Sequence, residues 1–404
     1  MPATVIGLGL VSLLTDLSSD AIFPLLPAFL AALGAAHVWV GVVEGVADLV
    51  ASLLKYFVGL VADRRPTLKP LVLFGYGVST VARPLVALAA APWHVLAVRI
   101  ADRVGKGVRS SPRDALIAGA TDAAIRGRAF GFHRAMDHAG AALGTMLASG
   151  LLWLLGTGTS GVTLHTMRQV FVVAAVPGVL AMLALVLTPE PRRAAPKRDA
   201  TGVEAAPLPP ALRRGLLAVI LFAIANATDA FLLVKAMELG ASPALTPMLW
   251  LLLHLVKAAT GTRGGRLSDR VGKKRALMLG WSVYALTWGA VGLVGSLPVL
   301  FGVTAIYGTS HGLVEGAEKA LVAELAGGRR LGKAFGAYNL AVGVAALVSS
   351  TTFGWVWDHL GGRVAFVGSA LFAVLAVVAL AVLVPAPVKP ANAAELRPTA
   401  AEYP

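Results

Sequence analysis

Pairs of carboxylates lie one helical turn apart within long apolar segments of this chain. Asp16 and Asp20 form one such pair, and Glu44 and Asp48 form another. Residues three or four positions apart share one face of a helix, so each pair could bind a cation, carry a proton or pair with a base. A carboxylate buried in apolar surroundings without such a partner is strongly disfavoured. These acids therefore mark either a site or a structural ion pair.

Residues 92–119 carry a stripe of charges that is mostly basic. Steps of three and four residues place five of them along one helical face, at Arg99, Asp102, Lys106, Arg109 and Arg113. Such a stripe would be untenable in contact with lipid. It must line a wet cavity or pair with acids of neighbouring helices, and a wet basic wall favours an anionic or zwitterionic solute.

The elements that position these charges are predicted to be membrane-spanning helices. Of 404 residues, 57% are hydrophobic and 14% are charged, against about 25% charged in soluble domains. Apolar stretches rich in Ala, Leu and Val are long enough to span a bilayer as helices, so the sequence predicts an all-α membrane protein. Twelve transmembrane helices are expected, near residues 5–33, 38–62, 70–91, 92–119, 127–156, 168–188, 214–238, 243–266, 274–294, 297–323, 332–356 and 362–385. Kinks are expected at Pro24, Pro27, Pro112 and Pro247.

Basic residues gather on one side of these spans. The connections of the opposite side hold only Arg168 and Arg363. The positive-inside rule then places both termini in the cytoplasm of a multi-pass protein, for which a bacterial inner membrane is expected. The net charge of +14 is read as a topology signal with anionic lipid as its partner, and no nucleic-acid binding is expected. The chain has no cysteine, which excludes disulfides and thiolate metal sites.

Three sequence blocks recur at an offset of about 205 residues, which indicates a duplicated unit. The matching blocks are 59–64 with 265–270, 113–118 with 318–323, and 127–131 with 332–336. Parallel six-helix repeats place a solute path between the halves. The expected units are an N-terminal six-helix bundle at 1–188, a cytoplasmic linker at 189–213, a C-terminal six-helix bundle at 214–385 and a disordered cytoplasmic tail at 386–404.

The second copy of the first block, Gly265 to Leu277, resembles the loop signature of the major facilitator superfamily, Gly-x-Leu-Ala-Asp-Arg-x-Gly-Arg-Lys-x-x-Leu. The similarity covers essentially the whole chain. Residues 99–147 look most like prokaryotic drug/proton antiporter-type permeases: Gly140 and Gly144 match their fifth-helix signature, and Thr145 replaces its proline. The resemblance implies the major facilitator fold, with two pseudo-symmetric six-helix bundles and transport by alternating access.

The two copies of this loop are candidates for a cytoplasmic gate. An Asp at the end of one helix can accept from the N-terminal amides of a neighbour and pair with Arg, and Gly permits close helix approach. Alternatively, these residues only fix the loop topology. The gate candidates are Gly59, Asp63, Arg64, Gly265, Asp269, Arg270, Gly272 and Lys273.

Buried acids are the candidates for proton coupling. Asp20 and Asp229 come first, because each lies in the first span of its half, and Asp137 and Glu318 follow. Arg113 and Lys319 occupy nearly equivalent places and could grip an anionic group from both halves. The substrate-cavity candidates are Asp16, Glu44, Asp48, Arg109, Arg113, Asp114, Arg134 and Lys319. Structural pairing is the alternative for each.

The predicted function is secondary active transport, with proton-coupled efflux of a small organic solute or drug by an antiporter. The alternative is a proton-coupled transporter of a nutrient or a divalent metal ion on the same fold, because the acids of the first two spans could converge with His133 or His138. No protease, nucleophile-elbow or phosphate-loop motif occurs at a usable spacing, so an enzyme is not expected. Neither a cofactor nor a resident metal is expected, and the chain is expected to act as a monomer.

Overall fold

The computed structural model describes residues 1–63, 65–121, 126–156, 162–190, 208–326 and 331–384, and every regular element in these ranges is a helix. The first group of elements is α1 (Ala3–Asp20), η1 (Phe23–Leu25), α2 (Leu26–Ala32), α3 (His37–Asp63), α4 (Lys69–Leu85), η2 (Val86–Leu88), α5 (Pro92–Gly119), α6 (Arg126–Leu155), α7 (Leu164–Val173) and α8 (Ala175–Leu187). The second group is α9 (Pro210–Ala225), α10 (Ala230–Glu238), α11 (Thr246–Val271), α12 (Lys273–Leu293), α13 (Leu297–Leu325), α14 (Leu331–Leu360) and α15 (Gly362–Leu383). The predicted all-α membrane fold is confirmed.

Ten helical stretches in the described part of the chain are long and apolar enough to cross a membrane. Two further helices, α5 with 28 residues and α11 with 26, are as long. Both carry several charges, α5 through the basic stripe and α11 through a basic end that contains Arg263, Arg266 and Arg270. The set is consistent with twelve passages, two of which depend on neighbours to shield their charges.

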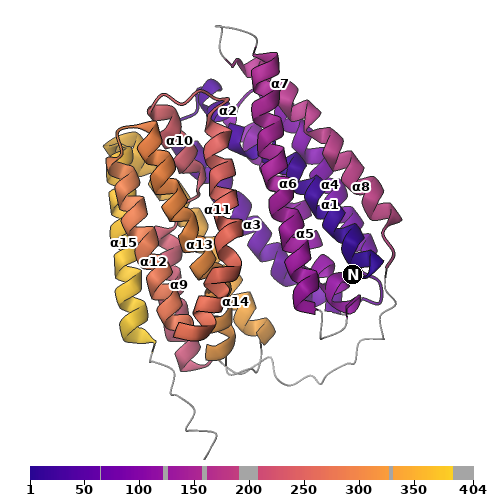
Figure 1. Cartoon of the computed structure of the whole chain (residues 1–404), viewed down its shortest axis with the longest axis vertical. Helices are drawn as coiled ribbons and strands as arrows, with labels where there is room; N and C mark the ends of the chain where they lie inside the picture. Colours follow the sequence, from indigo (N-terminus) through magenta and orange to yellow (C-terminus); the bar gives the residue numbers. More distant parts are fainter. Residues whose placement is uncertain (64, 122–125, 157–161, 191–207, 327–330, 385–404) are drawn as a thin grey trace, which may run out of the picture.

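Two groups of helices lie side by side, and we call α1–α8 the N-half and α9–α15 the C-half (Figure 1). In the N-half, α5 packs on α3 and α4; in the C-half, α13 packs on α11 and α12 in the corresponding way. We call the end of the molecule where α1 and α9 begin the basic end, and the other end the far end. Most of the predicted linker 189–213 and all of the tail 386–404 lie outside the described residues.

The first span of each half is interrupted in the middle. In the N-half the break follows α1 at Ala21, ahead of Pro24 and Pro27, as a proline-induced interruption predicts. In the C-half the break runs from Asn226 to Asp229 without any proline, and the Thr228 N–H donates to Ser350 Oγ of α14 over 3.1 Å. A neighbouring helix thus satisfies the freed backbone group.

Neither of the other two prolines breaks a helix. Pro112 lies within the continuous helix α5. Pro247 stands at the first turn of α11, where a proline fits because that N–H has no helical partner. The expected kink at Pro247 was therefore wrong, because the helix starts later than the predicted 243. At α9 the error is opposite: the helix begins at Pro210 rather than at 214.

Two seams join the halves. Helix α3 packs on α14 along its length, and α6 packs on α11. At Gly41 of α3 the backbones approach so closely that a Cβ would lie 1.9 Å from the Ser350 carbonyl oxygen. The α6–α11 seam is closed near the far end, where Ser149 Oγ donates to the Ala244 carbonyl over 3.0 Å. Figure 1 shows α6 and α11 diverging toward the basic end.

An acid from one half caps a helix of the other half at the far end. The Asp358 carboxylate of α14 accepts the first backbone N–H groups of α3, those of His37 over 2.9 Å and Val38 over 2.8 Å. It also contacts His37 Nδ1 over 2.7 Å, and the Trp357 ring stacks on the imidazole with centroids 5.3 Å apart. We call these contacts the far-end latch. The two halves are thus held together at the far end, whereas α6 and α11 diverge toward the basic end.

Candidate functional site

The acids and bases of α3, α4 and α5 form a dry ion cluster inside the N-half. Arg99 donates three bonds to Glu44, from Nη2 over 2.6 Å and 2.7 Å and from Nε over 3.0 Å. Asp102 accepts from Arg83 Nε over 3.0 Å and lies 3.6 Å from Arg99. Glu44 is 5% exposed and Asp102 is 2% exposed. Glu44 is therefore a structural partner here and not a residue of an open cavity.

Arg83 was absent from the candidates predicted from sequence. It lies in α4, and besides pairing with Asp102 it donates to the Thr15 carbonyl of α1 over 2.8 Å. The signal that could have revealed it is an arginine alone within an otherwise apolar span, because such a charge requires a partner.

The next bases of α5 are also engaged within the N-half. Arg109 is buried, donates to Ser79 Oγ over 2.5 Å and lies over the Tyr76 ring at 4.4 Å. Arg113 bonds the carboxylate of its neighbour Asp114 over 2.9 Å. These contacts occupy Arg109 and Arg113 with partners of the N-half. The predicted grip of Arg113 and Lys319 on one anion stays untested, and only Lys319 lies on the wall of the cavity described below.

The acids of α1 lie along the seam with α6. Asp137 of α6 accepts from Ser12 Oγ and lies 3.6 Å from His133 and 3.8 Å from Arg134. Asp20 accepts from the indole N–H of Trp250 in α11 over 2.9 Å, so it links the two halves. Asp16 interacts electrostatically with both acids, and its carboxylate has no hydrogen-bond partner in the described part of the chain.

Asp229 stands in the break of the first C-half span and is fully engaged. It pairs with Lys257 over 2.8 Å, accepts from Tyr307 Oη over 2.5 Å and lies 3.7 Å from His311. Two neighbouring helices, α11 and α13, thus satisfy this carboxylate. Protonation of Asp229 would break its ion pair with Lys257. Protonation of Glu44 or Asp102 would likewise break an ion pair.

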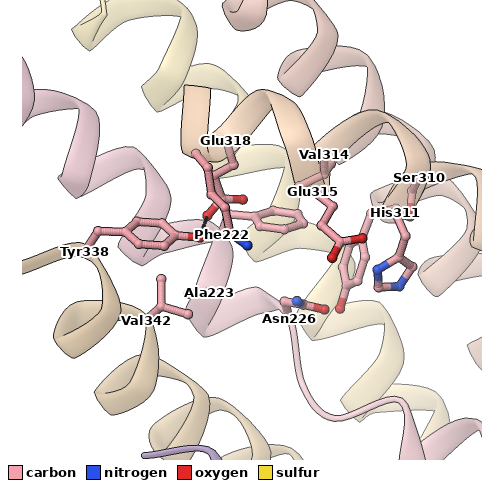
Figure 2. Close-up of a pocket in the computed structure, with 12 residues that line it drawn as sticks. Phe222, Ala223, Asn226, Ser310, His311, Val314, Glu315, Glu318, Tyr338 and Val342 are labelled. Carbon is pink, nitrogen blue, oxygen red and sulfur yellow. Dashed lines mark hydrogen bonds between the residues drawn. The ribbon is translucent and has the colours of Figure 1, made fainter. Parts of the chain in front are cut away.

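A cavity of about 200 Å³ opens within the C-half between α9, α12, α13 and α14 (Figure 2). Glu318 lies in its wall, 8% exposed, and accepts from Tyr338 Oη over 2.9 Å. Among the described residues no cation lies within 4.0 Å of Glu318. Figure 2 shows Glu315 and His311 on the other side of the same space.

Aromatic rings complete the cavity wall and set its chemistry. The rings of Phe222, Tyr284 and Tyr338 line it together with Asn226 and Ser310. Pockets that combine aromatic surface with a few placed polar groups are typical of small-molecule sites. Of the two carboxylates in this wall, that of Glu318 is the one that is both buried and, within the part described, free of an ion pair.

Charged side chains midway along three helices remain exposed, which indicates water between the halves. Lys106 of α5, Glu315 and Lys319 of α13 and Arg134 of α6 are all exposed. Arg134 and Glu315 form an ion pair between the halves, and each is 53% exposed. Asp48 of α3 is also exposed. This water-accessible space adjoins the cavity, because Glu315 and Lys319 belong to its lining.

The described gate candidates form contacts within their own halves in this structure. Asp269 pairs with Lys273 of its own half over 2.9 Å, and Gly272, with a φ of 90°, turns the chain from α11 into α12. A Cβ added at Gly59 would lie 3.7 Å from Ser111 Oγ, whereas Gly265 faces open space. Arg270 is exposed. The Asp63 side chain and Arg64 lie outside the described residues.

The metal alternative gains no support from the geometry. Across the described ranges, no group of three His, Cys, Asp or Glu residues could hold a metal ion. Glu44 is paired with Arg99, and Asp20 is bonded to Trp250. His138 lies instead beside His254, with ring centroids 6.2 Å apart.

Comparisons with known proteins agree with this architecture. The family model of the Major Facilitator Superfamily matches residues 8–256 and, in a second match, 215–401. The MFS-type transporter MJ1317 of Methanocaldococcus jannaschii is 28% identical over 356 residues, which cover 87% of each chain. Multidrug resistance protein MdtH of Photorhabdus laumondii subsp. laumondii is 27% identical over 359 residues, 86% of this chain and 85% of the relative.

A solved structure shares the fold. The crystal structure of a bacterial homologue of the human lysosomal transporter Spinster, in an inward-facing and occupied conformation, gives a TM-score of 0.76 at 17% identity. The match covers 93% of this chain and 95% of that one. At this identity the likeness bears on the fold alone.

Proposed function

Because this chain belongs to the major facilitator superfamily and is a multi-pass membrane transporter, we propose that it exports a small organic solute in exchange for protons by alternating access. The observation that carries the proposal is Glu318, a buried carboxylate in the cavity wall that is hydrogen-bonded to Tyr338 and has no ion pair among the described residues. A carboxyl in this setting can gain and lose a proton without breaking an ion pair. It is therefore the first proton-coupling candidate.

The other predicted proton carriers rank by the same criterion. Asp229 would have to leave Lys257. Asp137 has a hydroxyl donor and two bases nearby. Asp20 accepts from Trp250 across the halves, so its protonation would alter a contact between them. Asp16, predicted as a cavity residue, lacks a hydrogen-bond partner in the described part and joins Glu318 as a carrier candidate.

The sidedness follows from the charge pattern. The positive-inside rule makes the basic end cytoplasmic, with both termini there and a bacterial inner membrane as the location. The far-end latch then faces outward, and the structure corresponds to an inward-facing state with its water-accessible space open to the cytoplasm. The name of MdtH, a multidrug resistance protein, supports an organic solute as cargo. Lipid is the surrounding partner, and a monomer suffices for this mechanism.

Alternating access requires the two ends to exchange roles. The far-end latch between α3 and α14 must open, while the basic end closes through the predicted gate residues Asp63, Arg64, Asp269 and Arg270. The exposed carboxylate of Asp269 can then exchange Lys273 for groups of the N-half. This motion moves the cavity from one side of the membrane to the other without moving the solute far.

The test is reconstitution in vesicles that contain a pH dye. Glu318→Gln is expected to abolish solute-dependent proton flux, because the amide cannot carry a proton while it keeps the hydrogen bond from Tyr338. The matched control is Glu324→Gln, the same change on the same helix at an exposed position, which should retain the flux.

Each result has a defined reading. Proton flux opposite to the solute supports antiport, and flux in the same direction would replace export with symport. Undiminished flux in Glu318→Gln, with both variants present in equal amounts, would remove Glu318 from the mechanism.

A further inference from the structure

The ion pair between Arg134 of α6 and Glu315 of α13 joins the halves beside the cavity. Both side chains are 53% exposed, and exposed ion pairs contribute little to stability. Glu315 also lines the cavity. A ligand that carries its own charges can therefore replace this pair with little loss. The pair presents a positive side chain from the N-half and a negative side chain from the C-half to the same water-accessible space.

Three lysines near this space form no ion pair within 4.0 Å in the described part of the chain. They are Lys55 of α3, Lys106 of α5 and Lys319 of α13, which we call the lysine cluster. Helix α3 packs on α5, Lys319 lies in the cavity lining, and Lys55 interacts electrostatically with both of the other lysines. The acids that act on them are Asp48 on Lys55, Asp16 on Lys106 and Glu318 on Lys319. None of these acids forms an ion pair within 4.0 Å with any of the three amines in the described part of the chain.

The C-half side of the cavity has the opposite character. Glu315 and Glu318 lie in its wall with the rings of Phe222, Tyr284 and Tyr338. Carboxylates next to aromatic faces favour an ammonium group, because the ring quadrupole attracts a cation. Glu318 is buried and bonded to Tyr338, whereas Glu315 is exposed and held only by Arg134. Glu315 is therefore the carboxylate that is accessible to a ligand.

We propose that the substrate is a zwitterion. Its ammonium group takes the place of Arg134 on Glu315, and its anionic group, a carboxylate or a phosphate, binds the lysine cluster. A purely cationic solute would face three amines that form no close ion pair among the described residues, and a purely anionic one would face two carboxylates. Only a solute with both charges neutralises both walls, and like charges at a binding site are strongly unfavourable. The inference rests on the proposed transport function and assigns its substrate class.

The first test uses probes that share one carbon skeleton. Thermal unfolding of the purified protein would be followed with 6-aminohexanoate, hexanoate and hexylamine, since a ligand that binds the folded state raises the Tm. The zwitterion is expected to bind at least about tenfold more tightly than either relative. A series of zwitterions from glycine to 8-aminooctanoate would define the preferred distance between the ammonium and carboxylate groups. O-phosphoethanolamine would test whether a phosphate binds in place of the carboxylate.

The second test uses charge variants. Glu315→Gln and Lys106→Gln should each weaken zwitterion binding about tenfold or more, while Glu315→Asp and Lys106→Arg retain part of it. The matched controls are Glu324→Gln and Lys235→Gln, which lie away from the cavity lining. In the exchange variant Arg134→Glu/Glu315→Arg an ion pair can still form, but the ammonium group meets an arginine. Zwitterion binding should be lost.

Several results would overturn the assignment. These are equal stabilisation by hexylamine or hexanoate, no stabilisation by any member of the zwitterion series, or full zwitterion binding by the exchange variant. Vesicle assays separate this inference from the proposed function. Proton flux driven by hexylamine alone would sustain proton-coupled transport and refute the zwitterion. Zwitterion binding without any proton flux would sustain the substrate class and refute the coupling.

Discussion

Individual charges of α5 fall into a dry set and a wet set. Arg99 and Asp102 are buried in the ion cluster with Glu44 and Arg83, whereas Lys106, one turn further along, is exposed. A single helix thus carries structural charges toward the far end and ligand-facing charges at mid-length. The distinction depends on whether a group of opposite charge, Glu44 of α3 or Arg83 of α4, comes within bonding distance.

Removal of one member of the dry set should be costly. Asp102→Asn leaves Arg83, Arg99 and Arg103 around a single acid, Glu44. Breaking a buried pair typically destabilises a protein by about 3–5 kcal/mol, so a clearly lower Tm in detergent is expected.

Asp48→Asn is the matched control, since Asp48 is an exposed acid with no ion pair in the described part. Its Tm should change little. Equal losses in the two variants would show that the cluster is not the source of the stability.

At the scale of the elements, the far-end latch holds the N-terminus of α3. Helix α3 begins at His37, and its first N–H groups would lack partners without the Asp358 carboxylate of α14. A carboxylate there also interacts favourably with the helix dipole. The cap comes from the opposite half, so opening the far end exposes the N-terminus of α3.

The latch predicts a shift in conformation. Asp358→Ala removes a charged cap worth about 1–2 kcal/mol, which corresponds to about a 5–30-fold change in population. The far end should open more often. The chain has no native cysteine, so Ser350→Cys, buried in the α3–α14 seam, supplies a single thiol for labelling from the far side.

Thiol labelling at position 350 should be several-fold faster in the Asp358→Ala background than with Asp358 intact. Asp358→Asn, which retains one acceptor oxygen, should give an intermediate rate. Identical rates in all three proteins would mean that the latch does not hold the far end closed.

For the whole molecule, the α3–α14 seam is the contact along which the halves must move. It is close-packed at Gly41, where any side chain would meet the Ser350 carbonyl. The α6–α11 seam is closed at the far end by Ser149 and Ala244, and closer to the basic end the exposed pair of Arg134 and Glu315 bridges the halves. The halves can therefore rock about α3 and α14 while the other seam opens and closes.

This geometry makes Gly41→Ala a test of the seam. The added Cβ would lie 1.9 Å from a backbone oxygen, so the two helices must separate. Overpacking of this kind costs about 1–3 kcal/mol, and both the Tm and the transport rate should fall. Gly302→Ala on α13, which has open space around it, should leave both unchanged. A wild-type Tm in Gly41→Ala would contradict the observed packing.

The sequence by itself determined the membrane fold, the approximate spans and the internal repeat. These features depend on composition and on local periodicity, which are properties of one helix at a time. The same reasoning identified Asp20, Asp137, Asp229 and Glu318 as charges that need an explanation. It could not tell which of them are paired, because the sequence around a buried acid is the same whether or not a base from another helix lies beside it.

Only the tertiary structure decided which charges are paired. The rotation and approach of α3, α4 and α5 bring Glu44 to Arg99 and Arg83 to Asp102, and those of α10 and α11 bring Asp229 to Lys257. The break at Asn226, which no proline marks, likewise depends on Ser350 of another helix. Ion pairs and caps act over a few ångströms between residues far apart in the chain. Their partners are therefore fixed by helix packing and not by sequence spacing.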